Sequence, residues 1–99
     1  MALIEQQAGR LVIRSAMTVE TVNALLTESL PLLVADVEFD LQEVVDADSS
    51  AISLMFEWLR QAQDRKIGVT YANLPDTLVS LAKLYEVLEL IPQRSGATH

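Results

Sequence analysis

The sequence has 99 residues, a length that fits one domain built around one hydrophobic core. Apolar residues make up 51% of it, which excludes a disordered chain, and the absence of cysteine excludes disulfides and thiolate metal sites. The formal net charge of −7 disfavours direct binding to nucleic acids or anionic membrane surfaces. The single histidine, His99, is the last residue, so no histidine base has a place within the fold.

The sequence contains no secretory signal, and its apolar runs are far shorter than the roughly 20 residues that span a bilayer. We therefore expect a cytoplasmic protein that does not insert into a membrane. Its single domain is expected to cover residues 1–92, and residues 93–99 form a polar tail.

The first two elements are expected to form a β-hairpin. Short apolar runs at Met1–Ile4 and Leu11–Ile13 flank a turn in which Gly9 can adopt a conformation that other residues avoid. A helix is expected to begin at Thr18, because apolar residues then recur with the helical period, and Pro31 should end it.

Strands and helices alternate in the rest of the chain. Alternating apolar and polar residues predict a strand at Val37–Leu41, and Val69–Tyr71 is a second β-prone run. The clearest helix covers Ile52–Arg65, and a last helix begins near Pro75. The helical period places one apolar stripe of the Ile52–Arg65 helix toward the sheet: Ile52, Met55, Phe56, Leu59 and Ala62.

This order of elements, ββαβαβα, indicates an α/β fold in which a mixed sheet is joined by crossover helices. Signatures of enzymes are mostly absent. Asp46 and Asp48 could form a pair of carboxylates for acid–base chemistry, but aspartates before a helix more often cap it. A small enzyme that uses this pair stays open as an alternative, and no metal site is predicted.

The segment Asp48-Ser49-Ser50-Ala51-Ile52 follows an apolar strand and opens a helix. Its simplest interpretation is an N-cap, in which a serine hydroxyl or the Asp48 carboxylate accepts hydrogen bonds from free backbone N–H groups. A helix N-terminus also tolerates a phosphate. A phosphoserine there would add about −1.5 to −2 charges, enough to switch a docking surface.

The same helix carries a second candidate stripe. Leu54 and Trp58 lie on one flank of it, beside Ser50, Gln61 and Arg65. One stripe suffices for a helix that covers one sheet face. The flank therefore packs against a neighbouring helix or binds a partner, and tryptophan is enriched at binding hot spots. Our hypothesis is that truncating Trp58 weakens partner binding more than folding.

The motif from Val44 to Ile52, VVDADSSAI, resembles the start of the central helix in the STAS family. This family includes anti-sigma factor antagonists, cytoplasmic domains of sulfate-type anion transporters and a subunit of the bacterial Mla lipid-asymmetry transporter. The run from Val79 to Tyr85, VSLAKLY, is similar to the Mla-type subunit. The resemblance implies an α/β STAS-like mixed sheet of four to five strands with helices mainly on one face.

The resemblance also implies a function. In anti-sigma factor antagonists a partner kinase phosphorylates the residue that matches Ser49, and in the Mla-type subunit the matching hydroxyl contacts the transporter's ATPase. We therefore expect a non-enzymatic subunit without cofactors, held at the inner face of the inner membrane by the cytoplasmic ATPase of a phospholipid ABC transporter. The alternative is an anti-sigma factor antagonist that binds an anti-sigma factor kinase. The expected partner-binding residues are Asp48, Ser49, Ser50, Leu54, Trp58 and Gln61. Ala51 stands where the family usually has glycine.

Overall fold

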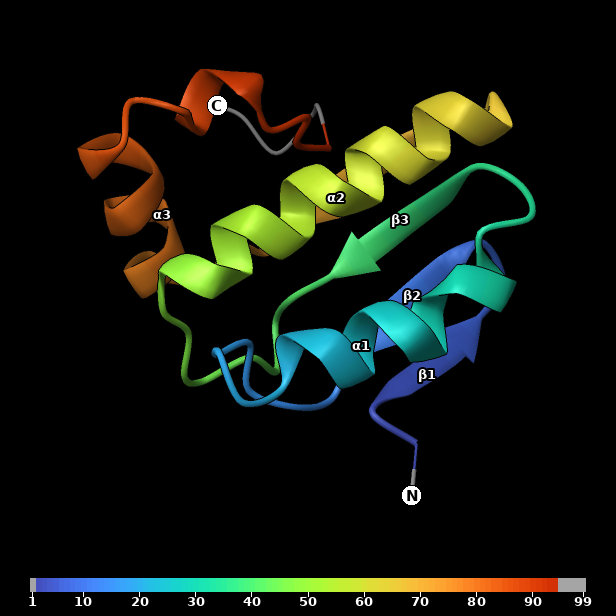
Figure 1. The fold of residues 1–99 in the computed structure, drawn as a ribbon, viewed down its shortest axis with the longest axis horizontal. Coiled ribbons are helices and arrows are strands. Elements are labelled where there is room, and N and C mark those ends of the chain that lie inside the picture. The colour runs from blue at the N-terminus through green and yellow to red at the C-terminus, as the bar shows by residue number, and fades with distance from the viewer. Residues whose placement is uncertain (1, 95–99) are drawn as a thin grey trace.

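The computed structural model describes residues 2–94, so Met1 and the predicted tail from residue 95 onward lie outside the described residues. In chain order (Figure 1), the described elements are β1 (Ile4–Gln7), β2 (Arg10–Ile13), α1 (Val22–Ser29), the 3-10 helix η1 (Leu30–Leu32), β3 (Val37–Asp40), α2 (Ser49–Arg65), β4 (Val69–Ala72), α3 (Asp76–Leu84) and the 3-10 helix η2 (Leu88–Leu90).

The strands of the described residues form one mixed sheet in the order β1-β2-β3-β4. β1 and β2 are antiparallel and meet at a turn in which Gly9 has a φ of 71°, whereas β2, β3 and β4 are parallel. α1 and α2 lie across the same face of the sheet, and α3 packs beside α2 (Figure 1). The predicted α/β fold, with a mixed sheet and helices mainly on one face, is confirmed.

The first strand lies further along the chain than the sequence predicts. β1 starts at Ile4, where the predicted strand Met1–Ile4 ends, and continues through polar residues. Such residues can be exposed on an edge strand, because it pairs with a neighbour along one side only and is covered by helices on one face only. The start of β1 is fixed by Glu28 of α1, whose carboxylate accepts hydrogen bonds from the N–H groups of Leu3 (3.1 Å) and Ile4 (2.9 Å).

The parallel strands bring three loops together. β2, β3 and β4 run in one direction, so their carboxyl ends meet at the same edge of the sheet. The loops that leave this edge cover residues 14–21, 41–48 and 73–75. They lead into α1, α2 and α3, and ligands of α/β sheets commonly bind outside this edge. We call it the carboxyl edge.

A stack of aromatic rings forms the centre of the core. Phe39 of β3 stacks on Trp58 of α2 with ring centroids 3.9 Å apart, and Tyr71 of β4 lies 5.6 Å from Phe39. Trp58 Nε1 donates to Ser29 Oγ (2.7 Å), and the Tyr71 hydroxyl donates to the carbonyl oxygen of Met55 (2.7 Å). Burial raises the pKa of Tyr71. The polar atoms of Trp58 and Tyr71 are thus hydrogen-bonded, the first where α2 meets α1 and the second where α2 meets β4.

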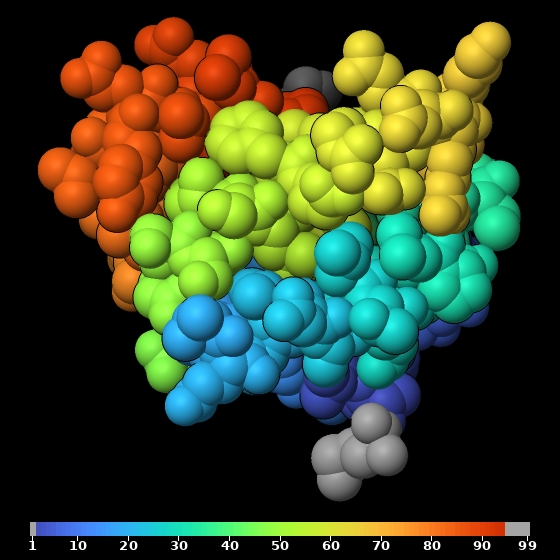
Figure 2. All heavy atoms as spheres, in the orientation of Figure 1, coloured from blue at the N-terminus to red at the C-terminus, as the bar shows by residue number. Residues whose placement is uncertain are grey.

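The hypothesis that Trp58 binds a partner is wrong, because its side chain is fully buried (0% exposed). α2 has one wide apolar stripe rather than two, consisting of Ala51, Ile52, Leu54, Met55, Trp58 and Ala62. Phe56 and Leu59, which were expected in the core stripe, are only half-buried at its rim. The stripe is wide because α2 lies between α1 and α3 while also covering the sheet (Figure 2).

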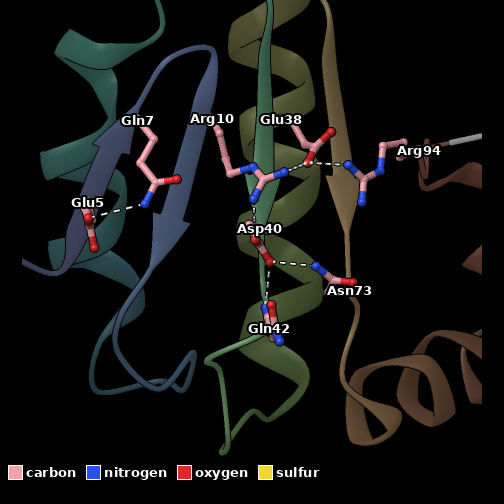
Figure 3. A network of polar contacts seen from close by, with 8 residues as sticks. All are labelled: Glu5, Gln7, Arg10, Glu38, Asp40, Gln42, Asn73 and Arg94. Atoms are coloured by element: carbon pink, nitrogen blue, oxygen red, sulfur yellow. Dashed lines mark hydrogen bonds and ion pairs between the residues drawn. The ribbon is translucent and has the colours of Figure 1, made fainter. Parts of the chain in front are cut away.

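The opposite face of the sheet carries a charged network (Figure 3). Arg10 of β2 forms ion pairs with Asp40 (3.2 Å) and Glu38 (3.5 Å) of β3, and Arg94 approaches Glu38 from the other side (3.4 Å). Asn73 Nδ2 donates to Asp40 Oδ1 (2.9 Å). Burial acts to raise the pKa of Asp40, but these hydrogen bonds and the arginine charges lower it below its ordinary value.

The outer edge of β4 is paired with residues near the end of the described chain. Tyr71 N–H donates to the carbonyl oxygen of Pro92 (2.9 Å), and Arg94 N–H donates to the carbonyl oxygen of Tyr71 (2.9 Å). Gln93 is therefore aligned parallel with Tyr71. The predicted tail begins at residue 93, but Gln93 and Arg94 are still attached to the fold through an isolated β-bridge to β4.

Candidate functional site

The N-terminus of α2 is capped by Asp48, as the sequence predicts. Asp48 Oδ1 accepts a hydrogen bond from Ser50 N–H (2.8 Å), and Oδ2 accepts one from Val19 N–H (3.1 Å). The bond from Val19 contributes most to lowering the pKa of Asp48, and the bond from Ser50 adds to it. Both carboxylate oxygens of Asp48 accept hydrogen bonds from backbone N–H groups. The geometry therefore does not support an acid–base role for Asp48 together with Asp46.

Two loops of the carboxyl edge are fastened to each other beside this cap. Met17 N–H donates to the carbonyl oxygen of Asp46 (2.9 Å), and Asp48 N–H donates to the carbonyl oxygen of Met17 (3.2 Å). Together with the bond from Val19 to Asp48, this bridge joins the loop before α1 to the loop before α2. The first turn of α2 is thus held in a fixed position, which lowers the ordering cost when a partner binds it.

Ser49, the first residue of α2, is exposed and takes no part in the hydrogen bonds of this scaffold. Ser50 and Asp48 are half-buried because their backbone and side-chain atoms take part in the cap. The three residues that the sequence singles out therefore lie together, but they differ in role. Asp48 and Ser50 build the cap, and Ser49 presents its hydroxyl to solvent.

Two hollows flank the first turns of α2. One hollow is lined by Ser49, Ser50, Ile52, Ser53 and Tyr85. The other lies toward α1 and is lined by Val22, Asn23, Leu26, Ser50, Ser53, Leu54 and Glu57. Leu54 is 4% exposed, so it contributes to the second hollow mainly as its floor. Ser53 contributes to both hollows, and a partner that covers Ser49 would meet it as well.

Three exposed apolar residues belong to segments that meet at the N-terminus of α2. Val45 is 91% exposed and lies just before the α2 cap, and Val19, bonded to Asp48 through its backbone, is 67% exposed. Tyr85 is 51% exposed and shares a hollow with Ser49. Exposed apolar groups that gather around one point indicate an interaction surface. We call Val19, Val45, Ser49, Ser53 and Tyr85 the Ser49 face.

Sequence reasoning missed most of the Ser49 face because its apolar members come from three separate segments. The sequence pattern predicts a helix from Thr18, whereas α1 starts only at Val22 and leaves Val19 exposed in the loop before it. Gln61 lies outside the face: it is half-buried, and its Nε2 donates to Glu57 Oε2 (2.9 Å). Twelve residues of helix separate it from Ser49, a rise of about 18 Å.

Comparison with known proteins defines the class. A family model matches residues 2–92, so the chain belongs to the STAS domain family. The model carries the description "Mlab, STAS domain". A search of curated proteins finds no match. Within residues 2–94, no helix is both long enough and apolar enough to cross a membrane.

Two solved structures have the same fold. A protein of Thermotoga maritima, assigned as an anti-sigma factor antagonist, superposes with a TM-score of 0.75 at 8% identity, over 95% of this chain and 86% of that chain. The anti-sigma factor antagonist SpoIIAA, in its unphosphorylated form, gives a TM-score of 0.67 at 17% identity, over 96% of this chain and 87% of that chain. At these identities the likeness defines the fold.

Proposed function

We propose that this STAS domain is a non-enzymatic subunit that binds the cytoplasmic ATPase of an Mla-type phospholipid ABC transporter and supports its activity. The observation that carries the proposal is the exposed Ser49 hydroxyl, presented by a rigidly capped helix end within an apolar surround. The description of the matching family model, which covers residues 2–92, supports the choice of partner. By this proposal the domain is held at the inner membrane only through the ATPase.

The arrangement suits docking because little has to be ordered on binding. The Asp48 cap and the Met17–Ala47 bridge already fix the first turn of α2. A partner that covers the Ser49 face removes Val19, Val45 and Tyr85 from water, and its side chains can enter the hollows on either side of Ser53. The gain from burying apolar area is then opposed by a small conformational cost.

The first experiment purifies the tagged domain from its native host and asks which protein is bound in a defined stoichiometry. We expect an ABC ATPase, and we expect addition of the domain to change the ATP hydrolysis rate of the purified ATPase. Recovery of an anti-sigma factor of the histidine-kinase type, without any ABC ATPase, would refute the transporter proposal.

A pair of variants tests whether Ser49 is the contact. Ser49→Gln places a larger neutral side chain in the centre of the face, and we expect it to weaken binding about tenfold or more. Thr27→Gln places the same side chain at an exposed position of α1 outside both hollows and serves as the control. Both variants should keep the wild-type melting temperature. Equal affinities of the two variants would show that the partner binds elsewhere.

A second candidate function is that of an anti-sigma factor antagonist regulated by phosphorylation of Ser49. The likeness in fold to SpoIIAA, a protein whose structure is described as unphosphorylated, motivates this candidate. A phosphate on Ser49 would place about two negative charges beside Asp48 and thereby change the docking surface. Incubation with a cognate kinase and ATP should add the mass of one phosphate to the wild type and none to Ser49→Ala. An unchanged mass of the wild type would argue against this candidate.

A further inference from the structure

Among the described residues, the arginine side chains are engaged within the fold, whereas the exposed Lys66 and Lys83 form no ion pair. Arg10, Arg14, Arg60 and Arg94 form ion pairs with carboxylates, and Arg65 donates to the carbonyl oxygens of Leu30 and Leu33. The sequence has 14 acidic and 7 basic residues. Carboxylates are therefore left over once the arginines are paired, and their position determines the electrostatic character of the surface.

Two of these carboxylates border the Ser49 face. Glu20 follows Val19 in the loop before α1, and Asp46 follows Val45 in the loop before α2, and both are exposed. Within residues 2–94, neither carboxylate takes part in an ion pair. The loops that contain them are bridged by Met17 and Ala47, which keeps the two acidic groups on the same side of the molecule.

The surface thus combines two independent features. It contains three apolar side chains, Val19, Val45 and Tyr85, that are more than half exposed. Its border is acidic, and the same loops contain one basic residue, Arg14, which is already paired with Glu5 and Glu43. An anionic membrane surface or a nucleic acid would be repelled by this border, whereas a basic protein surface would be attracted.

We propose that the Ser49 face binds a protein surface in which lysine or arginine side chains surround an apolar side chain. This inference rests on the proposed docking function but does not depend on whether the partner is an ATPase or an anti-sigma factor. The apolar group enters the hollow lined by Ser49, Ser53 and Tyr85, and the basic groups pair with Glu20 and Asp46. Association is then steered by charge and weakens as salt is added.

The test compares two charge reversals. Asp46→Lys borders the Ser49 face, and Asp64→Lys makes the same change near the other end of α2, about 22 Å from Ser49 by the helical rise. With the partner that binds the wild type, Asp46→Lys should lower the association rate constant about three- to tenfold at low salt, and Asp64→Lys should change it less than about twofold. Equal effects of the two variants, or a wild-type rate independent of salt, would overturn the inference.

A second measurement separates this inference from the identity of the partner. The isotope-labelled domain is titrated with a synthetic amphipathic helix of lysine and leucine, and with a control in which glutamate replaces lysine. We expect the lysine peptide alone to shift the amide signals of Val19, Val45, Ser49 and Tyr85. Shifts spread over the whole surface, or equal binding of the glutamate peptide, would refute a basic partner even if an ATPase binds. Localised shifts without any bound ATPase would instead refute only the transporter proposal.

Discussion

At the scale of single residues, the environment of a side chain decides its role more than its type. Trp58 and Ser49 belong to the same helix, and both are residue types that proteins use at interfaces. Trp58 stacks on Phe39 and donates to Ser29 inside the core, whereas Ser49 is exposed at the capped end. The spacing along the helix alone could not distinguish them, because it does not reveal that α1 covers the flank of α2 on which Trp58 lies.

The variant Trp58→Phe tests the structural role of this residue. It keeps an aromatic ring against Phe39 but removes the donor to Ser29 Oγ, so we expect a loss of about 1–3 kcal/mol in the free energy of unfolding. Urea unfolding of Trp58→Phe, Ser29→Ala and the double variant measures the coupling between the two residues. We expect the partner affinity to stay unchanged. Weaker partner binding with unchanged stability would indicate that Trp58 is exposed, which would contradict the structure.

At the scale of elements, the order and type of the helices and strands follow from the sequence, but their boundaries do not. Gly9 marks the hairpin turn and Pro31 follows the end of α1, but α2 ends with Lys66 as its C-cap and α3 ends at Leu84, well before Pro92. β1 is displaced from its predicted position because its start depends on a distant residue, Glu28 of α1. The apolar stripe of α2 is wider than its sequence pattern indicates because two helices and the sheet share it.

The end of α2 offers a test of a single local conformation. Lys66, which follows the last turn, has φ 60° and ψ 43°, the left-handed conformation that glycine adopts with less strain. Lys66→Gly should therefore raise the free energy of unfolding by about 0.5–1 kcal/mol. Lys66→Ala is the control, because it removes the same charge without relieving the strain. Equal melting temperatures of Lys66→Ala and Lys66→Gly would contradict this explanation.

At the scale of the whole molecule, the distribution of charge over the surface depends on the fold, whereas the sequence determines only the net charge. The net charge of −7 follows from the composition, but which carboxylates form ion pairs with arginines depends on which strands are neighbours in the sheet. Arg10 and Arg94 reach Glu38 from opposite sides because β2 lies on one side of β3, and β4 with the segment that pairs to it after η2 lies on the other. The Ser49 part of the site could be predicted from its motif, whereas its apolar surround and acidic border required the fold.

The network of Asp40 predicts how stability changes with pH. Its pKa in the folded protein lies below the ordinary value of 3.8, so its contribution is fully present above that pH and is lost as the pH falls through the folded pKa. Asp40→Asn should be less stable than the wild type at neutral pH, and the difference should shrink below about pH 4. Urea unfolding over a pH series measures this difference, with Asp64→Asn as an exposed control. A difference that is constant with pH would show that Asp40 does not stabilise the fold through its charge.

The directions of the outermost strands bear on how the protein should be labelled. β1 runs antiparallel to β2, so Ile4 lies opposite Ile13 at the carboxyl edge, and Gln93 runs parallel to β4 toward the same edge. A fluorescent protein or affinity tag fused near either of these positions would therefore be attached on the side of the molecule that holds the Ser49 face. The turn at Gly9 lies at the opposite edge, and the space around this residue is open. Insertion of a small reporter there would leave the route to Ser49 unobstructed.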